Sequence, residues 1–142
     1  MLTTDCIFLE NELMDVVRLF KSRPLCVKHS FRFENGAFYN DFAVDGQAYS
    51  FKDEGQVSDE REYKRLERRF AKLGLYAILS DLYGEKMPWG ALTGIRPTKL
   101  AYAETEAGRD FVPLFKKMRV SEEKISLVKE VLKTQEGIYA KK

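Results

Sequence analysis

Two short turns, ten residues apart, constrain this chain more than any other feature of its sequence. Asn35-Gly36 and Asp45-Gly46 are typical two-residue hairpin turns, because both central positions of such a turn need positive φ. Before the first turn, residues 25–33 alternate between the two faces of an expected strand. The sequence therefore predicts a three-stranded antiparallel meander.

The two turns also predict the register of the three strands. Pairing across the first turn puts Phe33 opposite Phe38, and pairing across the second puts Phe42 opposite Tyr49. Both pairings place the aromatic residues on the same side of the sheet. We expect this face to be buried, with the following members: Val27, Phe31, Phe33, Phe38, Phe42, Val44, Tyr49 and Phe51.

The segment before the meander predicts a short strand over residues 6–9 and a helix over about residues 12–21. Asn11 is the expected N-cap of this helix, because its side chain can accept a hydrogen bond from the first turn. Four apolar residues at helical spacing form the expected inward face: Leu13, Val16, Val17 and Phe20.

A helical half follows the meander. Asp59 and Glu62 have the spacing of a capping box, which predicts a long helix from Ser58 or Asp59 to a stop at Gly84. Further helices are predicted over residues 98–105, 108–118 and about 121–140. This order is typical of an α+β fold in which helices pack on a small antiparallel sheet. We interpret residues 1–142 as a single domain, with a strand–helix–meander part over 1–57 and a helical part over 58–142.

The composition excludes several classes of protein. A formal charge of +2, from 24 basic and 22 acidic residues, gives no strong attraction to nucleic acid or to a membrane. Residues 1–10 do not resemble a secretory signal, and no apolar run approaches the roughly 20 residues of a transmembrane helix. We therefore expect a cytoplasmic protein without a membrane partner. Two cysteines, Cys6 and Cys26, and one histidine, His29, are too few for a zinc or iron–sulfur site.

No catalytic set of side chains can be assembled from these residues, so we predict no catalytic residue and no metal site in this chain. His29 is the only side chain with an ordinary pKa near neutrality, and it lies on the face expected to be buried. This position favours a hydrogen-bonded core histidine over a catalytic base. Cys6 and Cys26 are expected in strand segments, where no partner base is indicated.

One face of the long helix is basic, and an RNA- or nucleotide-binding module is the alternative function that it suggests. Glu60, Glu62 and Glu67 are interleaved with the basic residues, however, which favours a solvated helix face or a domain interface. We therefore do not expect a nucleic-acid partner. The basic residues of this face are Arg61, Lys64, Arg65, Arg68, Arg69 and Lys72.

Residues 88–99 read Pro-Trp-Gly-Ala-Leu-Thr-Gly-Ile-Arg-Pro-Thr-Lys and include the only tryptophan, Trp89. Pro97 suits the first turn of a helix, whose free backbone N–H groups attract anions. Two interpretations stay open. The segment is either a rigid corner that docks Trp89, which its chemistry favours, or an anion site formed by Thr93, Arg96, Thr98 and Lys99.

The string over residues 88–99 resembles the signature of the N-terminal region of HemZ-type oxygen-independent coproporphyrinogen dehydrogenases. These are radical S-adenosylmethionine (SAM) proteins of porphyrin and haem biosynthesis. Residues 79–84 and 120–135 also resemble the corresponding helices of that family, so that the resemblance covers roughly the whole chain.

The resemblance implies an oxidoreductase reaction that this chain does not perform by itself. In the family, a 4Fe–4S cluster held by a Cys-x-x-x-Cys-x-x-Cys motif cleaves SAM, and the resulting radical starts oxidative decarboxylation of two propionates. This chain lacks the motif, and neither Cys6 nor Cys26 matches its positions. The chain therefore resembles an accessory domain without the radical SAM barrel, and no cofactor is assigned to it.

The resemblance also names the partner, which is the C-terminal radical SAM domain of a longer parent protein. We expect docking on that domain, or help in positioning substrate, through Trp89, Thr93, Arg96 and Lys99. Arg96 and Lys99 are expected to meet a carboxylate, either a tetrapyrrole propionate or an acidic residue of the barrel.

Overall fold

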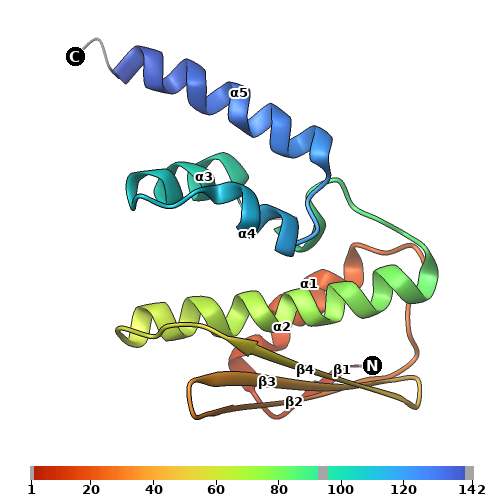
Figure 1. The fold of residues 1–142 in the computed structure, drawn as a ribbon. Coiled ribbons are helices and arrows are strands. Elements are labelled where there is room, and N and C mark those ends of the chain that lie inside the picture. The colour runs from red at the N-terminus through yellow and green to blue at the C-terminus, as the bar shows by residue number, and fades with distance from the viewer. Residues whose placement is uncertain (1, 93–95, 140–142) are drawn as a thin grey trace. The chain divides into compact units, whose positions relative to one another are not determined.

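The computed structural model describes residues 2–92 and 96–139 of the chain. They form an α+β fold with a four-stranded mixed sheet and a helical C-terminal half (Figure 1). The chain divides into two compact units, which we call the sheet unit (Met1–Glu85) and the helical unit (Lys86–Lys142). Among the described helices, none has the length and apolar character that crossing a membrane requires.

The meander confirms the predicted pairing. Strands β2 (Val27–Glu34), β3 (Ala37–Val44) and β4 (Gln47–Glu54) are antiparallel neighbours in the order of the chain. Phe33 lies opposite Phe38, and Phe42 lies opposite Tyr49, as the turns predict. Asn35 and Asp45 have φ of 52° and 48°, which is the conformation that these hairpin turns need.

The aromatic face of the meander is covered by two helices, α1 (Glu10–Arg18) and α2 (Glu60–Tyr83), which lie on the same side of the sheet (Figure 1). The expected burial of this face is confirmed only in part. Its buried members are Val27, Phe38, Phe42 and Val44, its partly buried members are Phe31, Tyr49 and Phe51, and Phe33, at the end of β2, is 38% exposed. Gly74 of α2 allows a close approach, since a Cβ there would lie 3.0 Å from the Phe42 ring. The sheet and α2 therefore share one core.

The N-terminal strand is displaced from its predicted position. Strand β1 is Leu2–Thr4 and pairs in parallel with β2, so the sheet is mixed. The strand predicted over residues 6–9 is wrong, because Ile7–Leu9 forms a short 3₁₀ helix, η1. Only Leu9 of this apolar run is buried, which a turn of helix allows and a core strand does not.

Helix α1 begins two residues earlier than the sequence predicts. Leu9 occupies the N-cap position, and Asn11 lies inside the helix, so the predicted N-cap is wrong. Glu10 and Glu12 place negative charge at the positive end of the helix dipole. The predicted inward face is confirmed, since all four of its members are buried: Leu13, Val16, Val17 and Phe20.

Helix α2 has the predicted ends. The Asp59 carboxylate accepts a 2.8 Å hydrogen bond from the Glu62 backbone N–H, and Gly84 ends the helix with φ of 67°. The Glu85 carboxylate then accepts the backbone N–H groups of Lys21 and Ser22 at 2.8 and 3.1 Å. These bonds hold the end of α2 within the sheet unit. The boundary between compact units therefore falls after Glu85, whereas the sequence interpretation divides the chain at residue 57.

The helical unit contains a 3₁₀ turn, η2 (Gly90–Leu92), and helices α3 (Pro97–Glu106), α4 (Phe111–Lys117) and α5 (Glu122–Tyr139). Helix α4 starts later than predicted, because the Asp110 side chain caps it and Gly108 lies in the preceding turn with φ of 80°. The buried apolar side chains of this unit are Ala91, Leu92, Ala101, Phe111, Phe115, Met118, Val120, Ile125 and Val128.

Candidate functional site

The segment that begins the helical unit is bound to the junction between α4 and α5. The Pro88 carbonyl accepts a 2.9 Å hydrogen bond from the Ser121 N–H, and the Ala91 N–H donates to the Met118 carbonyl at 2.8 Å. These backbone bonds join residues that lie far apart in the sequence. They give residues 88–92 a defined place within the unit.

Gly90 is required at the centre of this contact. Its φ is 54°, and a Cβ at this position would lie 2.3 Å from the Met118 carbonyl oxygen and 2.4 Å from that of Arg119. Both neighbours are backbone atoms, so a side chain cannot be accommodated by a rotamer change. The sequence pattern therefore places a glycine where the segment crosses the α4–α5 junction.

Trp89 is half-buried, and its indole ring lies beneath the ammonium group of Lys124 on α5. The Lys124 Nζ is 5.5 Å from the ring centroid, within the range of a cation–π contact. Trp89 thus has its cationic neighbour in Lys124, and not in Arg96 or Lys99, among the residues that the structure describes. Thr93, also expected at this site, lies outside the described residues.

Arg96 and Lys99 are both exposed at the start of α3. Arg96 is the N-cap residue, with φ of −83° and ψ of 96°, and Pro97 occupies the first turn as predicted. No acidic side chain lies in the first turn, and no side chain caps it. Within the described part of the chain, neither cation forms an ion pair. Two free cations at the positive end of the helix dipole provide the chemistry for holding a carboxylate or phosphate.

The basic face of α2 is largely neutralised by its own helix and by α1. Lys72 is partly buried, and burial lowers the pKa of its ammonium group. Three of the other basic residues are in ion pairs of 3.4–3.6 Å: Lys64 with Glu60, Arg65 with Glu62 and Arg68 with Glu12. The face therefore attracts a phosphate backbone less than its composition indicates.

His29 is a core histidine, as the strand pattern predicts. It is 3% exposed, lies 4.7 Å from the Phe42 ring, and burial lowers its pKa. Its Nδ1 is 2.7 Å from the Thr4 hydroxyl, and its Nε2 is 2.8 Å from the Asn40 amide oxygen. The neutral Nε2–H tautomer satisfies both contacts, with Thr4 donating to Nδ1.

The sequence interpretation missed a polar cluster on the inner side of α2. Glu67 is 8% exposed, although the sequence places it among surface charges. The Cys6 thiol donates to Glu67 Oε1 at 3.7 Å, and the Tyr63 hydroxyl lies close enough to this carboxylate for the Glu67 charge to act on its pKa. Burial, with the Glu67 charge, raises the pKa of Cys6 and raises that of Tyr63 to about 12. The sequence contained a signal for the buried position of Glu67. Glu67 follows Tyr63 by four residues, so it lies on the same inward face of the helix.

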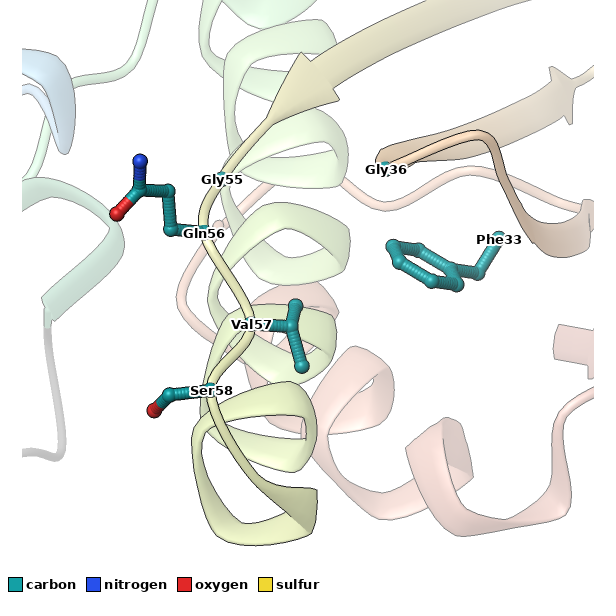
Figure 2. A pocket seen from close by; sticks show the side chains of 6 residues that line it. All are labelled: Phe33, Gly36, Gly55, Gln56, Val57 and Ser58. Atoms are coloured by element: carbon teal, nitrogen blue, oxygen red, sulfur yellow. The ribbon is translucent and has the colours of Figure 1, made fainter.

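Two pockets open on the sheet unit at the end of β2. One, of about 580 Å³, lies beside the first hairpin turn, where Phe33 and Val57 face each other and Gln56 and Ser58 point away (Figure 2). The other, of about 460 Å³, is lined by Asp5, Cys6, Ile7, Phe8 and Phe31.

Comparisons of this chain with protein-family models, curated proteins and solved structures gave no match. Within the described residues, no group of three or more His, Cys, Asp or Glu side chains is placed to hold a metal ion. The functional interpretation therefore depends on the resemblance of residues 88–99 and on the geometry of the sites described above.

Proposed function

We propose that this chain is the N-terminal accessory part of a radical SAM protein of the oxygen-independent coproporphyrinogen oxidase type. The helical unit docks on the catalytic barrel of the parent protein and helps to position a tetrapyrrole. The resemblance of residues 88–99 to that family motivates the proposal. The 4Fe–4S cluster and SAM belong to the barrel, and no residue of this chain is assigned to either.

The observation that carries the proposal is the pair of exposed cations at the start of α3. Arg96 and Lys99 lie on one helical turn and have no anionic partner among the described residues. A guanidinium binds a carboxylate through two parallel hydrogen bonds, and the helix dipole adds to the attraction. Propionate groups of a porphyrinogen and acidic residues of a barrel present the same carboxylate chemistry to this turn.

The corner formed by residues 88–92 supports a docking role. Its backbone is hydrogen-bonded to the α4–α5 junction, so its conformation is already ordered before any partner binds. A preorganised surface loses less conformational entropy on association than a flexible loop does. Trp89 adds a half-buried aromatic ring, a residue type common at the centre of interfaces.

The reading frame beyond the codon for Lys142 provides the first test. The proposal expects the frame to continue into a Cys-x-x-x-Cys-x-x-Cys motif and a barrel domain. The mass of the native polypeptide from source cells measures the same property. A native polypeptide that ends at Lys142 would contradict the proposal.

The second test uses the whole parent protein and the double substitution Arg96→Ala, Lys99→Ala. Loss of charge-assisted hydrogen bonds to a propionate raises the KM for coproporphyrinogen roughly tenfold or more, with a smaller change in kcat. Loss of a contact to the barrel instead weakens association of the two separately purified parts. The matched control is Lys116→Ala, Lys117→Ala, which removes two cations from α4. Unchanged activity and unchanged association would exclude both roles of Arg96 and Lys99.

The salt dependence of oligonucleotide binding separates this function from the nucleic-acid alternative. The ion pairs of Lys64, Arg65 and Arg68 give no support to that alternative. A phosphate-binding face loses affinity steeply as salt rises, and charge reversal at Arg61 and Lys64 weakens it further. We expect no binding at 0.1 M salt.

A further inference from the structure

We infer that the sheet unit carries an interaction surface for a protein segment that presents an apolar side chain next to a lysine or arginine. The surface lies where β1 ends beside β2. It is independent of the proposed function, because it belongs to the other compact unit and uses none of Trp89, Arg96 or Lys99. Its core is the pocket lined by Asp5, Cys6, Ile7, Phe8 and Phe31.

Two large apolar side chains at this pocket are exposed to solvent. Ile7 is 78% exposed and Phe8 is 81% exposed, although the next residue, Leu9, is fully buried. The 3₁₀ turn, closed by the bond from the Leu9 N–H to the Cys6 carbonyl, holds the two side chains outward. Exposed apolar patches of this kind mark binding surfaces in soluble proteins.

The patch continues along β2. Phe31 lines this pocket and Phe33 lines the pocket at the hairpin turn (Figure 2). Side chains two residues apart on a strand share a face, so the two pockets are neighbours. Phe33 and Val57 are 38% and 37% exposed, which extends the apolar surface beyond the first pocket.

Part of the β2 backbone edge is also unpaired at this surface. Strand β1 pairs with β2 only as far as His29, and the Asp5 side chain then accepts the Phe31 N–H at 2.9 Å. Asp5 thus ends the pairing and turns the chain into η1. Among the described residues, no strand covers the rest of this edge of β2, so an extended segment can lie along it.

Glu67 supplies the charge that selects the partner. It is 8% exposed, and none of the ion pairs in the part of the chain that the structure describes includes it. Its hydrogen-bond donor is the neutral Cys6 thiol, at 3.7 Å, and the neutral Tyr63 hydroxyl lies nearby. A carboxylate removed from water with only neutral partners gains strongly from a cation. Cys6 lines the pocket, so this charge lies directly behind the pocket wall.

Carboxylate groups give the surroundings of this pocket an acidic character. Burial and the Glu67 charge raise the pKa of both Cys6 and Tyr63, so both groups remain protonated and neutral beside the carboxylate. Asp5, on the pocket lining, adds a second carboxylate. An acidic segment is repelled at such a surface, and a purely apolar one leaves Glu67 without a counter-ion.

Two peptides that differ only in charge test the inference on the full 142-residue chain. The probes are acetyl-Leu-Phe-Arg-Leu-amide and the same peptide with citrulline, a neutral isostere, in place of arginine. Binding is followed by NMR shifts of the Ile7 methyl groups and the Phe31 amide. We expect the arginine peptide to bind roughly tenfold more tightly, and Glu67→Gln to remove the difference. Glu60→Gln, on an exposed part of the same helix, is the matched control and should leave the difference intact.

A second variant separates lost binding from lost folding. Ile7→Ser with Phe8→Ser changes only highly exposed side chains, so the fold is retained and both peptides should bind at least tenfold more weakly. The control is Leu25→Ser, at another apolar residue that is 84% exposed. Equal binding of the two peptides, unaltered binding after the Ile7/Phe8 change, or burial of this patch in a dimer of the chain would each overturn the inference.

Discussion

The two units of this chain are organised by different kinds of contact. In the sheet unit, two tight turns bring neighbouring strands together, and the aromatic face is then buried under α1 and α2. In the helical unit, the segment at residues 88–92 is bound to the α4–α5 junction, about thirty residues further along the chain. The meander of the sheet unit is built by local pairing, whereas backbone bonds between remote residues hold the first segment of the helical unit in place.

The units also differ in charge. Each contains 12 basic residues, but the sheet unit has 15 acidic residues and the helical unit has 7. The small net charge of the whole chain therefore hides a negative unit and a positive unit. This difference agrees with the two proposed surfaces, because the helical unit offers cations to a carboxylate and the sheet unit offers a buried carboxylate to a cation.

The largest effect is expected at the long-range contact of the helical unit. Gly90→Ala places a Cβ against the Met118 and Arg119 carbonyls, so we expect the free energy of unfolding of this unit to fall by about 4 kcal/mol or more. Fluorescence of the only tryptophan, Trp89, during urea unfolding measures it. The control is Gly108→Ala, which also has positive φ but open space, and should lower the free energy by about 1 kcal/mol. Equal effects of the two substitutions would show that the contact does not hold the unit together.

The core of the sheet unit is expected to respond next. Phe38 is fully buried and contacts the rings of Phe33, Tyr63 and Phe70. Phe38→Ala should lower the free energy of unfolding by about 3–4 kcal/mol, as removal of a buried ring does. Backbone amide exchange in β2 and β3 measures this loss, while the Trp89 transition reports the helical unit. A parallel loss at Trp89 would show that the two units unfold together. Phe33→Ala removes a partly exposed ring and serves as the control. It should lower the free energy of unfolding by less than Phe38→Ala does.

A pH titration sharpens the comparison, because the only histidine, His29, lies in the sheet unit. Burial lowers its pKa in the folded state, so the unfolded chain takes up the proton first as pH falls. The free energy of unfolding of the sheet unit should be constant above about pH 7 and should decrease below about pH 6.5, by at most about 1.4 kcal/mol per pH unit. Amide exchange of β2 between pH 7 and 5.5 measures this slope. His29→Gln should abolish it, and a slope that persists in that variant would assign it to another group.

The smallest effects are expected at the helix starts. Asp59 caps α2 through its side chain, so Asp59→Ala should lower the free energy of unfolding by about 1 kcal/mol. Arg96 makes no such bond at the start of α3, where a serine hydroxyl can cap the helix. Arg96→Ser should therefore raise the free energy of unfolding of the helical unit by about 0.5 kcal/mol. Thermal unfolding followed by circular dichroism and by Trp89 fluorescence measures both. A loss of stability in Arg96→Ser would show a structural role for this arginine.

Patterns of local origin were predicted well. The positive-φ turns and the alternation of β2 determine the register of the meander, because a shift of one residue would turn the aromatic face to solvent. The Asp59 cap and the Gly84 stop depend only on residues within one turn of the helix ends. The place of His29 in the core follows from the same alternation.

The failed predictions concern residues whose environment is set by other elements. The run at residues 6–9 has the composition of a strand, but the chain leaves the sheet edge after Asp5, and only Leu9 of the run is buried in the core. Helix α1 begins at Glu10 because η1 leads directly into it, so the side chain of Asn11 is not used as a cap. In both cases the tertiary path of the chain outweighs local propensity.

The sequence alone determined the α+β class, the meander with its register, the ends of α2 and the position of Pro97 in α3, since each depends on backbone conformations that a few adjacent residues select. The tertiary structure decided the remaining features. It placed Glu67 beside Tyr63 and beside Cys6, which lies 61 residues earlier in the chain. It also placed Gly90 against the Met118 carbonyl. It also left Arg96 and Lys99 exposed at the start of α3. Such arrangements depend on distances between segments that are remote in the chain, and a sequence pattern with a period of two or 3.6 residues carries no information about those distances.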